Sequence, residues 1–322
     1  MLLRNNFFVY QSITFFTIFF LFIPFSQSFA GPDLRPVNKP SLLINSDKQF
    51  EFAEYYFSNK EYFRAIGEYK RFVYFFPEDI RVELAMFRTG MSYFHGKHFT
   101  EAIDSFKTLI DRYVNTNFSI KSYFMISESH VKLKAYGPAI INLQNLIAVT
   151  DDGNVRDKAY YRIGWIYIET ASWEKARLYF SKISAQNKDK YRLERLAAEL
   201  DKEKLVPKKY PGLAGFFSII PGAGFLYCER YQDALIAFLL NGGLMYAAYE
   251  SFDNGHNALG GVIAFVEIGF YAGNIYGAIT SAHKYNRNKT GQFIEKLKYN
   301  TKVNLSADIN NQGVCLSLQF AF

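Results

Sequence analysis

The side chains that most often carry out chemistry are few in this sequence, and their spacing matches no common catalytic or metal-binding motif. The five histidines form no His-Glu-x-x-His pair, and the only close two, His95 and His98, fall at a turn between helices. There is no phosphate loop ending in Lys-Ser/Thr and no Gly-x-Ser-x-Gly elbow. Residues 151–154, Asp-Asp-Gly-Asn, lack the rest of a calcium loop. We therefore expect no catalytic residue, no metal, no cofactor and no enzymatic activity.

One acid stands in an unusual place. Glu267 is the only charged residue between Ala258 and Ile279. An ionisable side chain in such an apolar run is a candidate for function, and a structural hydrogen bond between helices is the alternative. Asn241 and Asn274 also lie within apolar runs and could contact it.

Composition excludes several classes of protein. The chain has 322 residues, of which 49% are hydrophobic and 18% aromatic, so it is not a disordered chain. Its two cysteines, Cys228 and Cys315, are too few for a disulfide scaffold or a cysteine zinc site. The net charge of +7 would suit nucleic acid, but the N-terminus points instead to anionic lipid or envelope partners.

The N-terminus has the pattern of an export signal. Arg4 is the only charge in the first 30 residues, and it precedes an apolar run from Ile13 to Phe25 and a small-residue ending at Ala30. We predict a signal peptide over residues 1–30, followed by a linker over residues 31–45. An uncleaved anchor helix is the alternative, and in both cases the following domain leaves the cytoplasm.

A period of 37 residues begins near residue 46. Small residues, aromatic residues and large apolar residues recur in register across four units. The alanine column comprises Ala65, Ala102, Ala139 and Ala176. The small column twelve residues earlier comprises Ala53, Gly90, Ser127 and Gly164. Such spacing predicts two helices per unit, with small residues allowing close approach and large residues filling the space between.

These columns resemble the tetratricopeptide repeat in its cell-envelope variety, as in the YbgF and BamD families. The segments Ala53-Glu54-Tyr55-Tyr56 and Tyr62-Phe63-Arg64-Ala65-Ile66 carry the likeness best, and it extends over roughly residues 46–186. The resemblance implies an all-α fold, an α-solenoid of four helix pairs closed by a capping helix within residues 46–205. It also implies a binding scaffold whose partners vary.

The first helices of the four pairs should line a concave face. We expect this face to form a groove for an extended or helical peptide. Packing of the same residues against neighbouring repeats, or against the chain's own tail, is the alternative. The predicted groove residues are Phe87, Met91, Phe94, Phe124, Glu128, Lys132, Tyr161 and Trp165.

Residues 206–290 change abruptly in composition and predict a membrane helical module. Residues 213–228 and 234–249 carry no charge, and the run from Ala258 is long enough to cross a bilayer. The first run, broken by Pro221-Gly222, suits a re-entrant or interfacial piece. A buried soluble hairpin docked on the repeats is the alternative. Residues expected to pack membrane helices are Gly261, Glu267, Gly269, Gly273 and Gly277.

The start of this module resembles another family. Pro221-Gly222-Ala223-Gly224 is similar to the Pro-Gly-x-Gly opening of small bacterial two-helix membrane modules, including the TM2-like families. Phe225 replaces the usual Gln, and Glu229 stands where Gly is common. The resemblance therefore implies a membrane helical hairpin without a ligand role for the turn.

The final segment, residues 291–322, predicts a basic tail with a short β-hairpin. Two runs of alternating apolar residues flank Asn310-Asn311-Gln312-Gly313. A terminal Phe322 after such a run looks like the last strand of an outer-membrane barrel, but one hairpin cannot close a barrel. We expect the inner membrane and keep the outer membrane as the alternative.

Together these features predict an exported, membrane-tethered scaffold in the bacterial cell envelope, with its repeats in the periplasm. It would bind another envelope protein or peptide, and membrane lipid, as an adaptor in envelope assembly or maintenance. We expect no nucleic acid and no small-molecule substrate. The alternative is an accessory subunit of a membrane transport or insertion complex that acts through its membrane helices.

Overall fold

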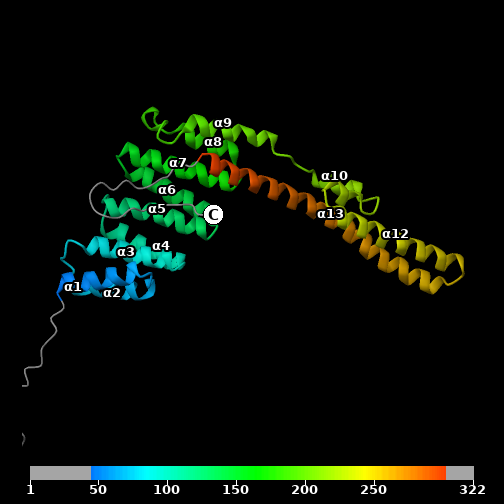
Figure 1. Cartoon of the computed structure of the whole chain (residues 1–322), viewed down its shortest axis with the longest axis horizontal. Coiled ribbons are helices and arrows are strands. Elements are labelled where there is room, and N and C mark those ends of the chain that lie inside the picture. The colour runs from blue at the N-terminus through cyan, green and yellow to red at the C-terminus, as the bar shows by residue number, and fades with distance from the viewer. Residues whose placement is uncertain (1–44, 302–322) are drawn as a thin grey trace, which may run out of the picture. The chain divides into compact units, whose positions relative to one another are not determined.

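The computed structural model describes residues 45–301, and every regular element in that range is a helix (Figure 1). The fold is an all-helical solenoid of the tetratricopeptide type followed by a long C-terminal helix. The predicted signal peptide, the linker up to residue 44 and the predicted β-hairpin lie outside the described residues.

Four helix pairs follow the predicted period of 37 residues. The first helix of each pair lies against the second, and each pair lies against the next. The pairs are α1 (Ser46–Ser58) with α2 (Tyr62–Phe75), α3 (Val82–His95) with α4 (Phe99–Arg112), α5 (Asn117–Lys132) with α6 (Tyr136–Val149), and α7 (Gly153–Glu169) with α8 (Trp173–Ser181).

Close packing within each pair confirms the small and alanine columns. Gly90 lies under the ring of Phe106, and a Cβ at Gly90 would come within 2.5 Å of that ring. Gly164 lies in the same way under Phe180, at 2.3 Å. The four alanines of the repeat are fully buried. A small residue is therefore required wherever an aromatic ring crosses the neighbouring helix.

The turn inside each pair repeats as strictly as the packing. Lys60, Lys97, Lys134 and Ala171 all adopt the left-handed conformation, with φ between 54° and 64°. In each turn the next amide donates to a carbonyl five residues earlier, as from Glu61 to Tyr56 at 2.9 Å. This is the Schellman arrangement, which satisfies carbonyls at a helix end and usually employs glycine. Here lysine or alanine, and not glycine, holds the left-handed position, so the sequence gives little sign of the motif.

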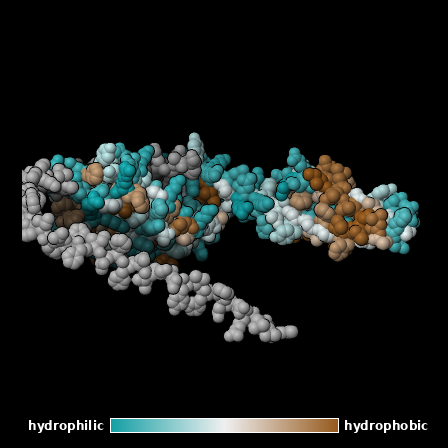
Figure 2. Space-filling model, turned by 90° about the horizontal axis from the view of Figure 1, so that it is seen from below, coloured by the Kyte–Doolittle hydropathy of each residue, from teal (hydrophilic) through white to brown (hydrophobic). Residues whose placement is uncertain are grey.

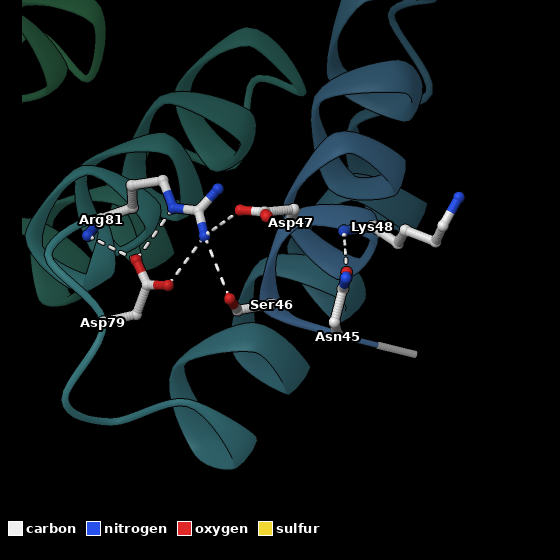
Figure 3. Close-up of polar contacts among 6 residues, drawn as sticks. All are labelled: Asn45, Ser46, Asp47, Lys48, Asp79 and Arg81. Carbon is white, nitrogen blue, oxygen red and sulfur yellow. Dashed lines mark hydrogen bonds and ion pairs between the residues drawn. The ribbon is translucent and has the colours of Figure 1, made fainter. Parts of the chain in front are cut away.

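The solenoid begins with a network of polar contacts at the start of α1 (Figure 3). The side chain of Asn45 accepts a hydrogen bond from the amide of Lys48 at 2.9 Å. Arg81, between α2 and α3, donates to Asp79 at 2.7 Å and pairs with Asp47 at 2.8 Å. The hydrogen bonds from Arg81 lower the pKa of Asp79. These contacts join the first turn of α1 to the second repeat.

The capping helix is α9 (Leu193–Asp201), preceded by η1 (Ala185–Asn187) and followed by η2 (Lys202–Leu205). It begins at Leu193 because Arg192 is left-handed, with φ 48°. Leu196 and Leu200 are buried against the last repeat. The charged outer side of α9 closes the stack.

The remaining helices are α10 (Pro211–Phe217), α11 (Ala223–Tyr227), α12 (Tyr231–Asp253) and α13 (Asn257–Asn300). Helices α12 and α13 form an antiparallel hairpin around Gly255. Helix α13 has 44 residues, so residues 291–300, assigned from the sequence to the tail, are helical. The basic composition of that segment hid its helical continuation.

Alanine substitution tests the packing in the solenoid. Gly90→Ala should lower the free energy of unfolding by about 1–3 kcal/mol, because the buried ring of Phe106 cannot move aside. Gly67→Ala is the matched control, since no atom lies within 4 Å of its Cβ position. The control should gain up to about 1 kcal/mol from helix propensity. Thermal unfolding of the full chain by circular dichroism measures both, and equal effects would contradict the account.

Candidate functional site

We use the term inner face for the side of the solenoid formed by the first helices of the pairs, α1, α3, α5 and α7. Of the eight residues predicted to line its groove, Phe94, Phe124 and Trp165 are partly exposed and Lys132 is exposed. The remaining four, Phe87, Met91, Glu128 and Tyr161, are buried. The face therefore offers fewer aromatic contacts to a partner than the repeat register predicts.

The buried members of the set hold neighbouring repeats together. The ring of Phe87 lies 5.5 Å from that of Phe106 and 5.3 Å from that of Phe118, which belongs to the next repeat. Tyr161 stacks on Tyr191 at 4.6 Å, and burial raises the pKa of Tyr161 to about 12. The contact of Phe87 joins neighbouring repeats, and the contact of Tyr161 joins the last repeat to the segment before the capping helix.

Ion pairs cross the inner face between successive units. Glu54 of the first unit pairs with Arg88 of the second at 3.0 Å. Glu128 of the third unit pairs with Arg162 of the fourth. Sequence reasoning missed both arginines, although they are separated by two repeat lengths, as are the two glutamates. The shared spacing of two repeat lengths was the signal for these ion pairs in the sequence. Between the second and third units, buried methionines stand at the corresponding positions in place of the charged pair.

The accessible part of the face is basic around Phe124. Lys158 lies 4.8 Å from the centre of the Phe124 ring. Lys132 is exposed on the same helix as Phe124, and its amino group lies 3.8 Å from the carboxylate of Glu128. Burial lowers the pKa of Lys121 and of Lys158, and the charges of Lys190 and Lys121 add to the effect on Lys158. An aromatic ring among cations suits an acidic segment that carries an apolar anchor.

A second hollow, which the sequence did not predict, lies between α2 and α4 over α3. Its volume is about 700 Å³. Lys70 donates to the hydroxyl of Tyr93 across it at 3.0 Å. Tyr74 and Met86 supply apolar lining, and Glu101 and Asp104 supply acid. It belongs to the side formed by the second helices, which the groove prediction did not cover.

The end of α13 occupies the last part of the solenoid. Leu297 is buried in one cluster with Tyr161, Leu196 and Leu200, and Trp165 packs against that cluster. The rings of Phe293 and Trp173 lie edge to face at 5.6 Å. This chain's own helix therefore fills the place that the sequence assigned to a partner at the fourth repeat.

Polar contacts fix this docking. Lys298 pairs with Glu169 at 3.0 Å, and Asn300 donates to Glu199 at 3.0 Å. The contact of Lys298 is with α7, and the contact of Asn300 is with α9. The end of α13 is thereby tied to both the last repeat and its cap.

The hairpin of α12 and α13 carries small and polar side chains in its seam. On α13 four of the buried residues recur every seven positions, and on α12 three of the buried residues form a row at the same spacing. The row on α13 comprises Gly260, Glu267, Asn274 and Ser281. The row on α12 comprises Ala234, Asn241 and Ala248. The sequence contains this row, whereas the prediction of the packing face rested on the four-residue spacing of the glycines.

The structure separates the predicted packing residues into two groups. Glu267 lies in the seam, 6% exposed. Gly277 packs under the ring of Phe225, while a Cβ at Gly261, Gly269 or Gly273 would meet no atom within 4 Å. These three glycines therefore face away from α12.

Two polar groups in the seam stand without hydrogen bonds among the described residues. One is the carboxyl of Glu267, with both of its oxygens, and the other is the side-chain carbonyl of Asn241. The side chain of Asn274, by contrast, forms hydrogen bonds through both its oxygen and its nitrogen. It accepts from the amide of Gly222 at 3.2 Å and donates to the carbonyl of Ser218 at 3.1 Å. Asn274 thus fixes the Pro-Gly-Ala-Gly turn onto α13, and this role is structural.

Large apolar side chains of the hairpin point outward. Figure 2 shows a broad apolar area on one face of the α12–α13 part of the molecule, next to a hydrophilic tip. The exposed members on α12 include Leu235, Ile236, Phe238, Leu239 and Tyr246. Those on α13 include Leu259, Val262, Phe265, Ile268 and Tyr276. An apolar surface with a small, polar interior is the reverse of a water-soluble helical hairpin.

Comparisons with known proteins agree with the repeats. Residues 84–116 and 158–189 match the family model described as tetratricopeptide repeat, so the chain contains such repeats. Comparison with curated proteins finds no significant match.

Three solved structures illustrate the likeness. The chain is 17% identical to MamA, covering 58% of this chain and 90% of that one, with a TM-score of 0.38. It is 15% identical to a tetratricopeptide repeat protein from Parabacteroides merdae, covering 78% and 98%, with a TM-score of 0.37. It is 14% identical to a Rap protein complexed with competence and sporulation factor, covering 79% and 76%, with a TM-score of 0.37.

The docking of α13 can be tested at its buried leucine. Leu297→Ala should cost about 2–5 kcal/mol of local stability, because it leaves a cavity in the cluster. Hydrogen exchange should then become faster in residues 290–300 and in α9, with α1–α4 unchanged. Lys296→Ala, exposed one residue earlier, is the control and should leave the exchange unchanged. Equal protection in both variants would show that the contact does not hold α13.

Proposed function

We propose that this protein is an exported, membrane-tethered tetratricopeptide scaffold that binds another protein of the bacterial cell envelope. The observation that carries the proposal is the hairpin with its apolar side chains outward, joined to the repeats by one unbroken helix. The repeats supply a binding surface and the hairpin supplies an anchor. The likeness to the YbgF and BamD families, drawn from the repeat sequence, is part of this proposal.

The dimensions of the hairpin suit a bilayer. Exposed apolar residues extend on α12 from Leu235 to Phe252, which corresponds to about 27 Å of helix at about 1.5 Å per residue. A bilayer core is about 30 Å thick. Among the helices in residues 45–301, α13 is the one that meets both the length and the hydropathy expected of a span, and 17% of its apolar window is buried.

The two ends of the hairpin module lie together. The amide of Lys209 donates to the side chain of Asn286 at 2.7 Å, and that side chain donates back to Lys209 at 2.7 Å. With the chain arriving and leaving at one end, α12 and α13 would cross the membrane as a pair. The repeats and the start of the tail would then share one side. A third crossing would need residues 213–228, but α10 has seven residues and α11 has five.

Charge is unequal at the two ends of the hairpin. Arg230, Lys284 and Arg287 lie at the end shared with the repeats, and Glu250 and Asp253 lie near the connecting loop. The preference for positive residues in the cytoplasm would by itself place the repeats inside the cell. We propose that the predicted export signal decides instead, because the first apolar segment usually dominates orientation.

The second candidate is the accessory subunit of a membrane transport or insertion complex. The carboxyl of Glu267, which has no hydrogen bond among residues 45–301, favours it, because an acid without a hydrogen bond in such a seam is costly to keep. In that case Glu267→Gln would abolish the transport or insertion function, and the repeats would serve only to bind other members of the complex. In the scaffold proposal the same substitution leaves partner binding intact.

Photo-crosslinking in cells tests the scaffold. A crosslinking amino acid at Phe124 should capture a protein, and the same group at Ile80, 96% exposed on the turn before α3, should not. Lys132→Ala should reduce capture about fivefold by removing an exposed cation from the helix that carries Phe124. Lys107→Ala, exposed on α4, is the control and should have no effect.

Three outcomes would decide against the proposal. Equal capture at Phe124 and Ile80 would show that the inner face is not the binding surface. Capture of a cytoplasmic protein would overturn the exported placement. Loss of capture in the Glu267→Gln variant would favour the membrane helices as the working part.

A further inference from the structure

We propose that a cavity beside the hairpin binds the phosphate-containing headgroup of an anionic phospholipid. The cavity lies between the turn that precedes α12 and the stretch of α13 that follows the apolar run. Its volume is about 540 Å³. The proposal rests on the membrane placement given above and names the lipid chemistry at its boundary.

Three cations line this cavity, and no carboxylate does. They are Arg230 from the turn before α12, with Lys284 and Arg287 from α13. Ser281, Tyr285 and Asn288 add a hydroxyl, a phenol and an amide. Guanidinium and ammonium groups with neighbouring neutral donors are the groups that bind phosphate oxygens.

The two acids next to Arg230 in the sequence region before and at the start of α12, Glu229 and Asp233, are already paired. Asp233 accepts from Arg230 at 2.6 Å, and Glu229 pairs with Lys209 at 3.2 Å. The hydrogen bond from Lys209 lowers the pKa of Glu229, and Tyr285 also donates to Glu229 at 3.2 Å. Within residues 45–301, Lys284 and Arg287 form no ion pair, so both charges are available to an anion.

Arg230 is held in position for this role. Its guanidinium donates to the hydroxyl of Ser281 at 2.9 Å, and its other side pairs with Asp233. The ring of Phe225 lies 5.8 Å from the same guanidinium. A cation fixed by three neighbours loses little side-chain freedom when an anion binds.

The place of the cavity favours a lipid over a dissolved phosphate. Exposed Leu226 and Tyr231 flank Arg230 in the sequence, and exposed Tyr276 lies one to two turns before Ser281 on α13. The cations therefore begin where the outward apolar surface ends, at the depth of headgroups. Gly273 and Gly277 lie on the same face of α13 as Lys284, and at Gly273 that face is open. An acyl chain could lie along this open face while its phosphate sits in the cavity.

Lipid titration of the full chain in uncharged detergent tests the proposal. Phosphatidylglycerol should bind saturably, and phosphatidylcholine should bind at least tenfold more weakly. Lys284→Gln combined with Arg287→Gln should weaken phosphatidylglycerol binding at least tenfold. The control combines Lys204→Gln with Lys208→Gln, which removes the same charge from exposed positions outside the cavity. The control should change binding less than twofold, and both double variants should melt at the temperature of the parent chain.

Each contrary result has its own meaning. Equal loss in the two double variants, or no preference for phosphatidylglycerol, would overturn the site and leave the anchor standing. Competition by millimolar inorganic phosphate with the same loss in the cavity variant would show a site for a free anion instead. Failure of the parent chain to stay with vesicles of phosphatidylcholine and phosphatidylglycerol would overturn the membrane placement itself.

Discussion

The arrangement of side chains in the α12–α13 hairpin is the constraint on which the rest of the structure depends. Alanine, glycine, serine and asparagine fill the seam, and phenylalanine, leucine and isoleucine cover the outside. In water this arrangement would leave the hydrophobic surface exposed and gain little from its burial in the seam. In lipid the same small residues let the helices approach closely, and the outward side chains meet acyl chains. In the proposed membrane setting, a hairpin with so little internal apolar contact would therefore be a stable unit.

Helix α13 joins this hairpin, which is the anchor in our proposal, to the repeats. It leaves the apolar region at Ser281 and ends at Asn300, where Leu297 is buried against the last repeat and Lys298 pairs with Glu169. The end of α13 therefore fills the place at the fourth repeat that a partner would otherwise take. A partner would be left with the first three repeats, where Phe124 and its neighbouring cations are accessible.

Much of the solenoid could be predicted from the sequence, because a period of 37 residues is visible in residue types alone. The burial of Phe87, Met91 and Tyr161 could not, because one helix face serves both the groove and the contact with the next repeat. The left-handed turns at Lys60 and its equivalents were also hidden, since lysine gives no sign of that conformation. In the hairpin, the glycines pointed to a packing face, but the seven-residue row through Glu267 forms it. The difference arises because small residues permit close packing without requiring it.

Quenching of tryptophan fluorescence by brominated acyl chains tests the outward apolar surface most directly. The two tryptophans of the chain, Trp165 and Trp173, both lie in the repeats, so the parent protein supplies its own background. Phe265 is 78% exposed on α13, and Phe265→Trp would place a third tryptophan on the proposed lipid-facing surface. In vesicles of brominated phospholipid, the variant should show strong quenching of its additional emission, and the parent chain should show almost none. Emission from the variant that is no more quenched than that of the parent would contradict the account.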